Sequence, residues 1–313
     1  AAALDVAAGT VARRWRRMTD AGTAWVSSVP GPHVAMFGAV FEARAVAGHI
    51  DHVAHKLAAS PNVASVYVTT GGFDLVALVL ADQLDTLNRL LLDDLPRLPQ
   101  IEQARSSIGI DWYSGARWRL GAISRQQANA VRLDSDGGRP IAARTQALSA
   151  QDRALYLALQ YDGRAGYRDL ARGLDSSEYQ VRRRISALER RGMLTFRTDF
   201  ARGPGGWAIQ LALWLAVPQD ELTEVGAEIA GWRQTRICLS IIAPANLIVI
   251  TQLHHLAEAE PLFDRIRAQW PRVQVPDQRV VLRRVKSWGR LLDRDDRAID
   301  VVPVDPWATS PDS

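Results

Sequence analysis

Cysteine is almost absent from this chain, which has only Cys238 among its 313 residues. An intrachain disulfide is therefore excluded, and no Cys-x-x-Cys metal or redox motif exists. Apolar runs such as 211–217 are far shorter than the roughly 20 residues that a membrane-spanning helix needs. No signal peptide is visible. We therefore expect a cytoplasmic protein with no membrane partner.

Sequence motifs of common enzyme classes are also missing. There is no phosphate-binding loop, no Gly-x-Gly-x-x-Gly, no His-Glu-x-x-His and no Gly-x-Ser-x-Gly. Asp93 and Asp94 are adjacent, so they point to different sides of a helix and form no catalytic pair. His49, His52 and His55 are spaced three apart, but no acidic residue or cysteine completes a metal site. We expect no catalytic residue, no metal and no cofactor.

The bulk composition is that of an ordinary globular protein. Hydrophobic residues make up 47% of the chain and charged residues 23%. The length favours two or more domains. The net charge of +4 permits a nucleic-acid partner without requiring one, so the position of the arginines matters more.

Two blocks of the sequence are similar to two later blocks, which indicates an internal repeat. We call residues 1–120 the first unit and residues 148–290 the second unit; a polar linker, 121–147, separates them, and a tail, 291–313, follows. The aligned pairs include Leu4 with Leu174, Val11 with Val181, Gly22 with Gly192, Ile50 with Leu222 and Asp74 with Asn246.

The second unit begins with a predicted helix-turn-helix, residues 148–203. A helix starts at about Ser149, a short second helix covers 167–172, and a turn at 173–176 leads to a third helix over 177–191 that ends at Gly192. Val181, Ile185 and Leu188 form the apolar stripe of that third helix.

The third helix has the character of a DNA-recognition helix. Its first turns carry polar and basic side chains off the apolar stripe, where they can reach base edges and phosphates in a major groove. A solvated surface helix is the alternative. The DNA-binding residues that we predict are Ser177, Tyr179, Gln180 and Arg183, with Arg182 and Arg184 as phosphate contacts, and, in the first unit, Arg13 and Arg14.

The first unit has only the end of such a domain, a third helix and wing in residues 1–28. Its first two helices are absent from the sequence, which begins without methionine. We therefore expect that the chain starts partway through a domain.

Each unit continues with a predicted ferredoxin-like βαββαβ block, at 29–120 and 204–290. In the first, strands are expected at 34–43, 63–70, 73–80 and 101–110, with helices at 45–59 and 83–95. The fold class is therefore α+β, with a winged-helix-type helix-turn-helix and a ferredoxin-like effector domain, repeated twice.

The strands at 75–80 and 209–217 are apolar on both faces. A sheet with helices on one side and water on the other should alternate instead. The open face should therefore pack on another such sheet, within the chain or between chains, and we expect a homo-oligomer built by sheet-to-sheet packing.

The segments 173–176, 181–185 and 188–192, followed by a βαββαβ block, resemble the Lrp/AsnC (feast/famine) family of transcription regulators. The hairpin at 70–75 resembles the effector-domain hairpin of that family. This resemblance implies double-stranded DNA and a small effector, usually an amino acid, as partners, with the effector at Gly71, Gly72, Phe73 and Asp74. The second unit departs from the pattern at 243–246, where Pro244 removes a backbone donor.

A regulator of transcription that responds to a ligand is therefore the expected function. A siroheme decarboxylase-like enzyme of similar architecture is the alternative, against which the absence of histidine from the strands argues. An interaction protein that has lost DNA binding is a further possibility. For the hairpin, a tight glycine turn in which Asp74 only stabilises the turn remains open beside ligand binding.

Overall fold

The computed structural model describes residues 4–114, 126–127 and 145–309. Most of the expected linker therefore lies outside the described residues. The helices and strands are α1 (Ala8–Asp20), β1 (Ala24–Pro30), β2 (Phe37–Ala45), α2 (Ile50–Ala59), β3 (Val63–Thr69), β4 (Leu75–Ala81), α3 (Leu84–Arg89), the π-helical η2 (Leu90–Asp94), β5 (Ile101–Ser114), α5 (Ala150–Tyr161), α6 (Tyr167–Gly173), α7 (Glu178–Arg190), β6 (Leu194–Phe200), β7 (Ile209–Ala216), α8 (Leu222–Ala230), β8 (Thr235–Ile241), β9 (Leu247–Leu253), η3 (Leu256–Glu258), α9 (Ala259–Gln269), β10 (Gln274–Ser287), β11 (Arg290–Leu292) and β12 (Ala298–Val301).

The main sheet closes on itself. Its strands follow the order β12-β11-β10-β3-β4-β2-β5-β8-β9-β7, and β7 also pairs with β10. Two long strands make this closure possible. β5 pairs with β2 in its first half and with β8 in its second, while β10 pairs with β7 and then with β3. The two expected sheets are therefore joined at both edges into one barrel, a correction to the picture of separate sheets stacked face to face.

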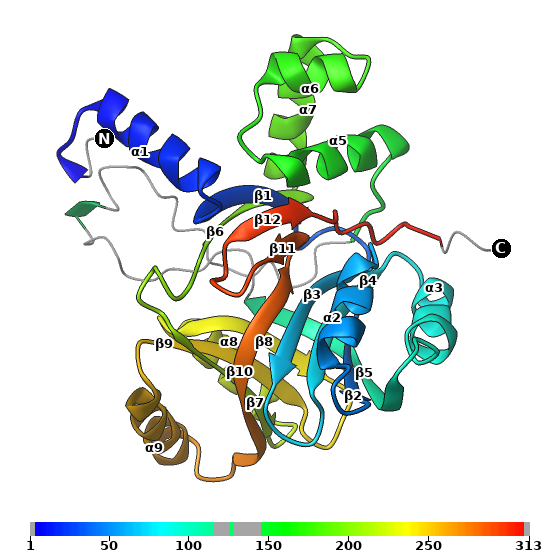
Figure 1. The fold of residues 1–313 in the computed structure, drawn as a ribbon, viewed down its shortest axis with the longest axis vertical. Coiled ribbons are helices and arrows are strands. Elements are labelled where there is room, and N and C mark those ends of the chain that lie inside the picture. The colour runs from blue at the N-terminus through cyan, green and yellow to red at the C-terminus, as the bar shows by residue number, and fades with distance from the viewer. Residues whose placement is uncertain (1–3, 115–125, 128–144, 310–313) are drawn as a thin grey trace.

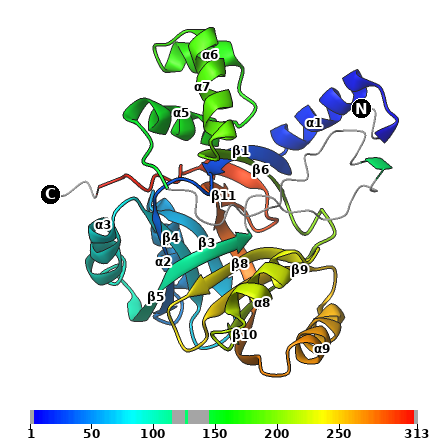
Figure 2. The same ribbon diagram turned by 180° about the vertical axis from the view of Figure 1, so that it is seen from behind.

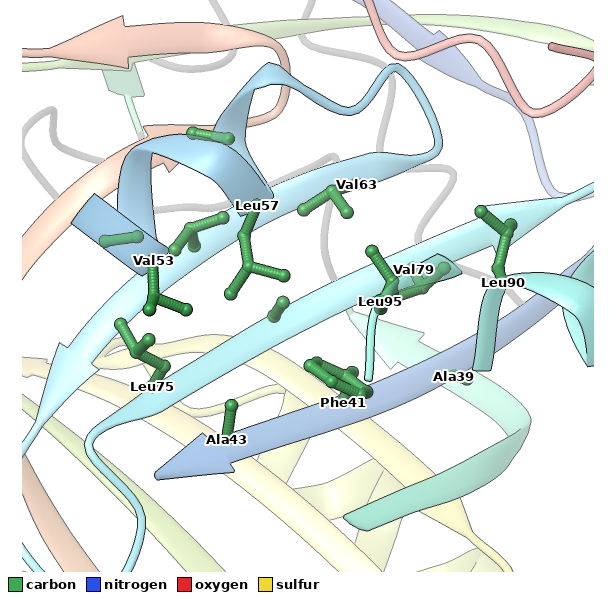
Figure 3. Close-up of a cluster of buried hydrophobic side chains, with 14 of the residues drawn as sticks. Ala39, Phe41, Ala43, Val53, Leu57, Val63, Leu75, Val79, Leu90 and Leu95 are labelled. Carbon is green, nitrogen blue, oxygen red and sulfur yellow. The ribbon is translucent and has the colours of Figure 1, made fainter. Parts of the chain in front are cut away.

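The apolar two-faced strands are explained by this closure. Side chains such as Leu78 and Val76 from β4, and Leu239 and Ile250 from β8 and β9, meet inside the barrel. The opposite face of the first half is covered by α2, α3 and η2, where Phe41, Leu57 and Leu75 lie in one buried cluster (Figure 3). α8 and α9 cover the second half in the same way. Because these faces meet within one chain, their burial does not require an oligomer, and chain assembly stays a prediction.

The predicted elements are present, with shifted ends. The first strand begins at Phe37 rather than 34, and α2 begins at Ile50 rather than 45, after Gly48 adopts a φ of 81°. The expected helix at 83–95 changes to π-helix at Leu90. β5 runs on to Ser114 instead of ending at 110, because its last residues pair with β8.

The helix-turn-helix projects from one end of the barrel. Figures 1 and 2 show α5, α6 and α7 at this end, with α1 beside them. Beneath them β1 and β6 pair antiparallel, from Ala24 opposite Phe200 to Pro30 opposite Leu194. The hydroxyl of Ser28 on β1 donates a hydrogen bond to the Tyr156 carbonyl on α5, at 2.7 Å. The N-terminal segment thus forms the base on which the second unit's domain rests.

The segment expected to be a tail after the second unit, residues 291–313, contains part of the sheet. Within residues 290–301, the strands β11 and β12 extend the sheet beyond β10. Farther on, Val304 is buried, and its backbone exchanges two hydrogen bonds of 2.7 Å with the Gln160 side chain of α5. Trp307 then packs edge-on against Tyr156. This segment therefore ties the helix-turn-helix to the barrel.

Strand β10 contains a buried lysine near its end. Lys286 is fully buried, and its ammonium donates to the Ser60 carbonyl at 2.9 Å. Burial disfavours the charged form and lowers the pKa of Lys286 from 10.5 to about 7.

We predict that stability rises with pH between 7 and 10 and that Lys286→Met removes part of this rise. In that window the unfolded chain keeps the Lys286 proton that the folded chain has lost, so raising the pH favours folding. The stability gained by Lys286→Met should shrink by about 1 kcal/mol per pH unit. Urea unfolding of both proteins at pH 7, 8 and 9 measures this, and parallel pH profiles would contradict it.

Candidate DNA-binding and ligand sites

α7 is a well-capped helix with an apolar inner side. The Ser177 hydroxyl accepts from the Gln180 amide at 3.2 Å, and the Gln180 side chain accepts from the Ser177 amide at 3.3 Å, a reciprocal capping box. Val181, Ile185 and Leu188 are buried in the core that α5 and α6 complete. At its other end Gly192 has a φ of 64°, the left-handed conformation expected of a C-terminal glycine. The helix is therefore capped at both ends and anchored by its buried side.

The outer side of α7 exposes part of the predicted DNA-binding set. Tyr179 is 72% exposed. Arg182 and Arg183 are exposed, and neither side chain forms a hydrogen bond or ion pair with the described residues. These three side chains lie together on the first turns of the helix. They remain candidates for contacts with bases and phosphates.

The other predicted residues of α7 have partners within the domain. Ser177 and Gln180 hold one another in the capping box. Arg184 donates to Gln151 on α5 at 2.6 Å and lies 3.6 Å from Asp152. These groups therefore fix the position of α7, and a phosphate contact by Arg184 requires it to leave these partners.

α1 presents Arg13 and Arg14 at the same end of the barrel. Both are exposed, and no residue of α1 is buried. Trp15 lies under the Arg164 guanidinium of the second unit, 5.0 Å from its ring centre. α1 thus resembles α7 in sequence while lacking the buried stripe that anchors α7.

The predicted effector residues lie together in the β3–β4 turn, but several of their groups are occupied. Asp74 accepts from the Ala45 amide at 3.0 Å, and the Gly72 carbonyl accepts two hydrogen bonds from Arg44. Gly71 has a φ of 102°, and a Cβ there would lie 3.2 Å from the Arg279 side chain. In this structure the Asp74 carboxylate therefore bonds the backbone next to the turn and stabilises it.

Phe73 is buried beneath a group of arginines. The Arg105 guanidinium lies 4.5 Å from its ring centre, with Arg44 and Arg279 at 5.9 Å. Glu42 pairs with Arg105 at 2.7 Å and with Arg279 at 2.9 Å. Strand β10 of the second unit thus covers the hairpin, and effector binding at Gly71–Asp74 stays a prediction.

The structure contains a buried charged group that sequence reasoning missed. The Asp199 carboxylate on β6 contacts Arg197 at 2.9 Å, Arg236 at 3.5 Å and Arg202, and all four side chains are at most 3% exposed. Ser287 on β10 lies 3.4 Å from the same carboxylate. Charged residues inside otherwise apolar strands are the sequence signal that points to such a group.

The burial of these charges and their closeness to one another shift their pKa values. Burial alone would raise the pKa of Asp199, but the attraction of Arg202, Arg197 and Arg236 outweighs it and holds the pKa well below its usual range. Burial lowers the pKa of Arg202 to about 10, and burial with repulsion from Arg197 lowers that of Arg236. Arg202 and the carboxylate therefore remain charged at neutral pH.

A pocket opens beside this charged group, between β7, β9, β10 and the β11–β12 loop. Its volume is about 480 Å³. Trp207 and Ala208 from the loop before β7 form one wall, and Gln252 of β9 lies at its base. Among the described residues no cluster of three or more histidine, cysteine, aspartate or glutamate side chains could hold a metal ion. No described helix is long and apolar enough to span a bilayer.

The chain thus combines a helix-turn-helix with a closed α/β barrel. The model of the AsnC-type helix-turn-helix domain matches residues 148–189, and that of the Lrp/AsnC ligand binding domain matches residues 39–114. The chain belongs to the Lrp/AsnC family. The sequence matches no curated protein.

Solved structures similar to this chain fall into two groups. The siroheme decarboxylase NirDL in complex with an iron-uroporphyrin III analogue is 15% identical, with a TM-score of 0.58 over 90% of this chain and 83% of that one. The protein FFRP-DM1 is 30% identical over 24% of this chain and 99% of its own, at a TM-score of 0.23. The regulator NMB0573 of Neisseria meningitidis, in complex with L-Met, is 16% identical over 44% and 90%, at a TM-score of 0.39. The first of these shows a shared fold.

We predict that Asp199→Asn strongly destabilises the protein. The substitution leaves Arg197, Arg202 and Arg236 buried without the carboxylate that they share, which typically costs about 3 to 5 kcal/mol of unfolding free energy. Chemical denaturation measures the change. Asp264→Asn on α9 is the matched control, because it removes only a surface ion pair and should cost less than about 1 kcal/mol. If the two variants have the same free energy of unfolding, the Asp199 carboxylate does not stabilise the three buried arginines.

Proposed function

We propose that this protein is a sequence-specific DNA-binding transcription regulator that responds to a small ligand. The observation that carries the proposal is the outer side of α7, where Tyr179, Arg182 and Arg183 are exposed on a capped helix. A helix of this kind places its first turns against base edges in the major groove, while arginines hold the phosphates.

The arrangement of the barrel end supports this function. α1 and α7 lie at the same end (Figure 1), so Arg13 and Arg14 would add phosphate contacts next to those of α7. In the described chain only α7 has companion helices α5 and α6. Two half-sites of an operator would then be read by two chains, which is our reason for proposing a homo-oligomer.

The effector proposed from the family is an amino acid at Gly71, Gly72, Phe73 and Asp74. The L-Met complex of the Neisseria regulator supports the ligand class for the family. In this chain the Arg44–Gly72 bonds and the Asp74–Ala45 bond must open before these groups contact a ligand.

A decarboxylase acting on a tetrapyrrole is the second candidate. It is supported by the fold shared with NirDL over 90% of the chain and by the arginine-lined pocket beside β10. The exposed basic side of α7, which such an enzyme would not need, makes the regulator the better supported of the two.

For DNA binding we predict that Arg182→Gln and Arg183→Gln have different effects. Loss of a phosphate contact at Arg182 should weaken binding to every sequence and flatten the slope of log affinity against log salt by about 0.9. Loss of a base contact at Arg183 should weaken binding to the selected site by about 1 to 3 kcal/mol and affect unrelated DNA less. A binding site is first selected from random DNA with the wild-type protein. Titrations of each variant on this duplex and on unrelated DNA, at several salt concentrations, then measure the affinity and the salt slope.

The control for this experiment is Arg267→Gln on α9, which removes the same charge from another exposed helix. It should leave affinity and salt slope unchanged. If Arg182→Gln and Arg183→Gln behave like the control, α7 does not read DNA.

The enzyme candidate has a separate test. We predict that siroheme incubated with the protein keeps its mass, because a regulator needs no decarboxylation chemistry. Mass spectrometry of the recovered tetrapyrrole detects loss of carboxyl groups as carbon dioxide. Multiple-turnover loss of carboxyl groups would establish the enzyme and overturn this prediction.

A further inference from the structure

The pocket beside β10 exists because of the way the barrel closes. β10 pairs with β7 as far as Val280, opposite Leu211, and then pairs with β3 from Val281 onward. β7 continues past that point and pairs only with β9, where Gln210 lies opposite Gln252. The two strands therefore separate beyond Val280 and leave a notch between them, which is where the pocket lies.

The base of this notch is polar and incompletely bonded. Gln252 has no exposed surface, and neither its Oε1 nor its Nε2 has a hydrogen-bond partner in the described chain. Gln210 beside it is 6% exposed. A buried amide without partners is unfavourable by about 1 to 3 kcal/mol. A polar ligand that enters the notch would supply the missing bonds.

The rim of the notch is lined by five arginines and two aspartates. Arg202 pairs with Asp199 and Arg283 with Asp51, so the basic character of the rim depends on the other arginines. Arg284 pairs with Asp296 at 3.1 Å. Arg294 and Arg297 are exposed on the β11–β12 loop, and neither side chain forms a hydrogen bond or ion pair with the described residues. The charged lining residues are Arg202, Arg283, Arg284, Arg294, Arg297, Asp295 and Asp296.

The wall of the notch formed by the loop before β7 is held by contacts within the protein. The Trp207 ring packs at a tilt against His254 with ring centres 4.0 Å apart, and the Trp207 amide donates to the Arg202 carbonyl at 3.0 Å. The loop turns so tightly that a Cβ on Gly205 would lie 2.3 Å from the Phe200 ring. A preformed wall lowers the entropy cost of binding.

The equivalent notch in the other half is filled. β5 leaves β2 after Ile108, opposite Ala39, and joins β8. Trp112 packs there, with its Nε1 3.2 Å from the position of a Cβ on Gly38, and it contacts Trp288 edge-on. An apolar indole thus occupies one notch, while the other has guanidinium groups and an unbonded amide.

We propose that the notch between β7 and β10 binds a small organic anion with at least two acidic groups, carboxylate or phosphate. Its volume of about 480 Å³ is within the usual range for small-molecule sites. Arg294 and Arg297 receive the acidic groups through paired N–H donors, the geometry in which guanidinium binds oxyanions most strongly. The unpartnered Nε2 of Gln252 donates to the acidic group that reaches the base of the notch. Any regulatory role of this anion, separate from the amino acid proposed at the hairpin, rests on the regulator function proposed above.

Calorimetry with simple probes tests the site. Succinate and inorganic pyrophosphate represent the two acid types, and succinamide is the neutral match of succinate. At least one dianion should bind the full chain, and succinamide should not. The double variant Arg294→Gln/Arg297→Gln should weaken binding at least tenfold, since hydrogen bonds to charged groups are among the stronger ones. Gln252→Leu removes the unbonded amide and should also weaken binding while the protein stays folded.

The matched control is Arg168→Gln/Arg172→Gln, two exposed arginines of α6 outside the pocket. It should bind the probe like the wild type. The proposal is overturned if neither dianion binds, if both double variants weaken binding equally, or if Asp74→Ala abolishes binding while the notch variants retain it. DNA titration without probe separates the two proposals: intact DNA binding with no anion binding refutes only the notch, and the reverse result refutes only the regulator.

Discussion

The exchange of two strands between halves of the molecule determines the rest of this structure. β5 and β10 are each 14 residues long, and each hydrogen-bonds to strands of both halves. Without them, each half would expose an apolar sheet face and two unpaired edges, which favour aggregation. With them, the faces become a single interior and every barrel strand is paired on both sides. The notch, the buried lysine on β10 and the position of the β11–β12 loop all follow from this crossing.

The same closure explains why charges are buried at one end of the barrel. β6 lies across that end, paired with β1, and so brings Asp199 above the ends of β8 and β10. An arginine in such a place keeps its charge only beside a carboxylate. The charged group therefore connects β6, the barrel and the loop before β7, so β6 and the pocket share one network of ion pairs.

Elements whose signals are local could be predicted from the sequence. α7 is bounded by Ser177 and Gly192, a cap and a stop that act within a few residues of the helix, and the structure has it within one residue of the expected ends. Features created by distant pairing could not be. The extension of β5 to Ser114 depends on β8, and the strands β11 and β12 are too short for a period to be detected. Arg197 and Asp199 escaped notice because polar residues in a strand are usually taken to face water.

The two notches of the barrel are unequal. A barrel formed by two identical subunits would carry the same residues in both notches. Here an indole, Trp112, fills the notch of one half, while the other half has the pocket with Gln252 at its base. Binding at the notch is therefore expected to have a stoichiometry of one per chain and a hyperbolic isotherm, so a cooperative response to the anion can arise only between chains.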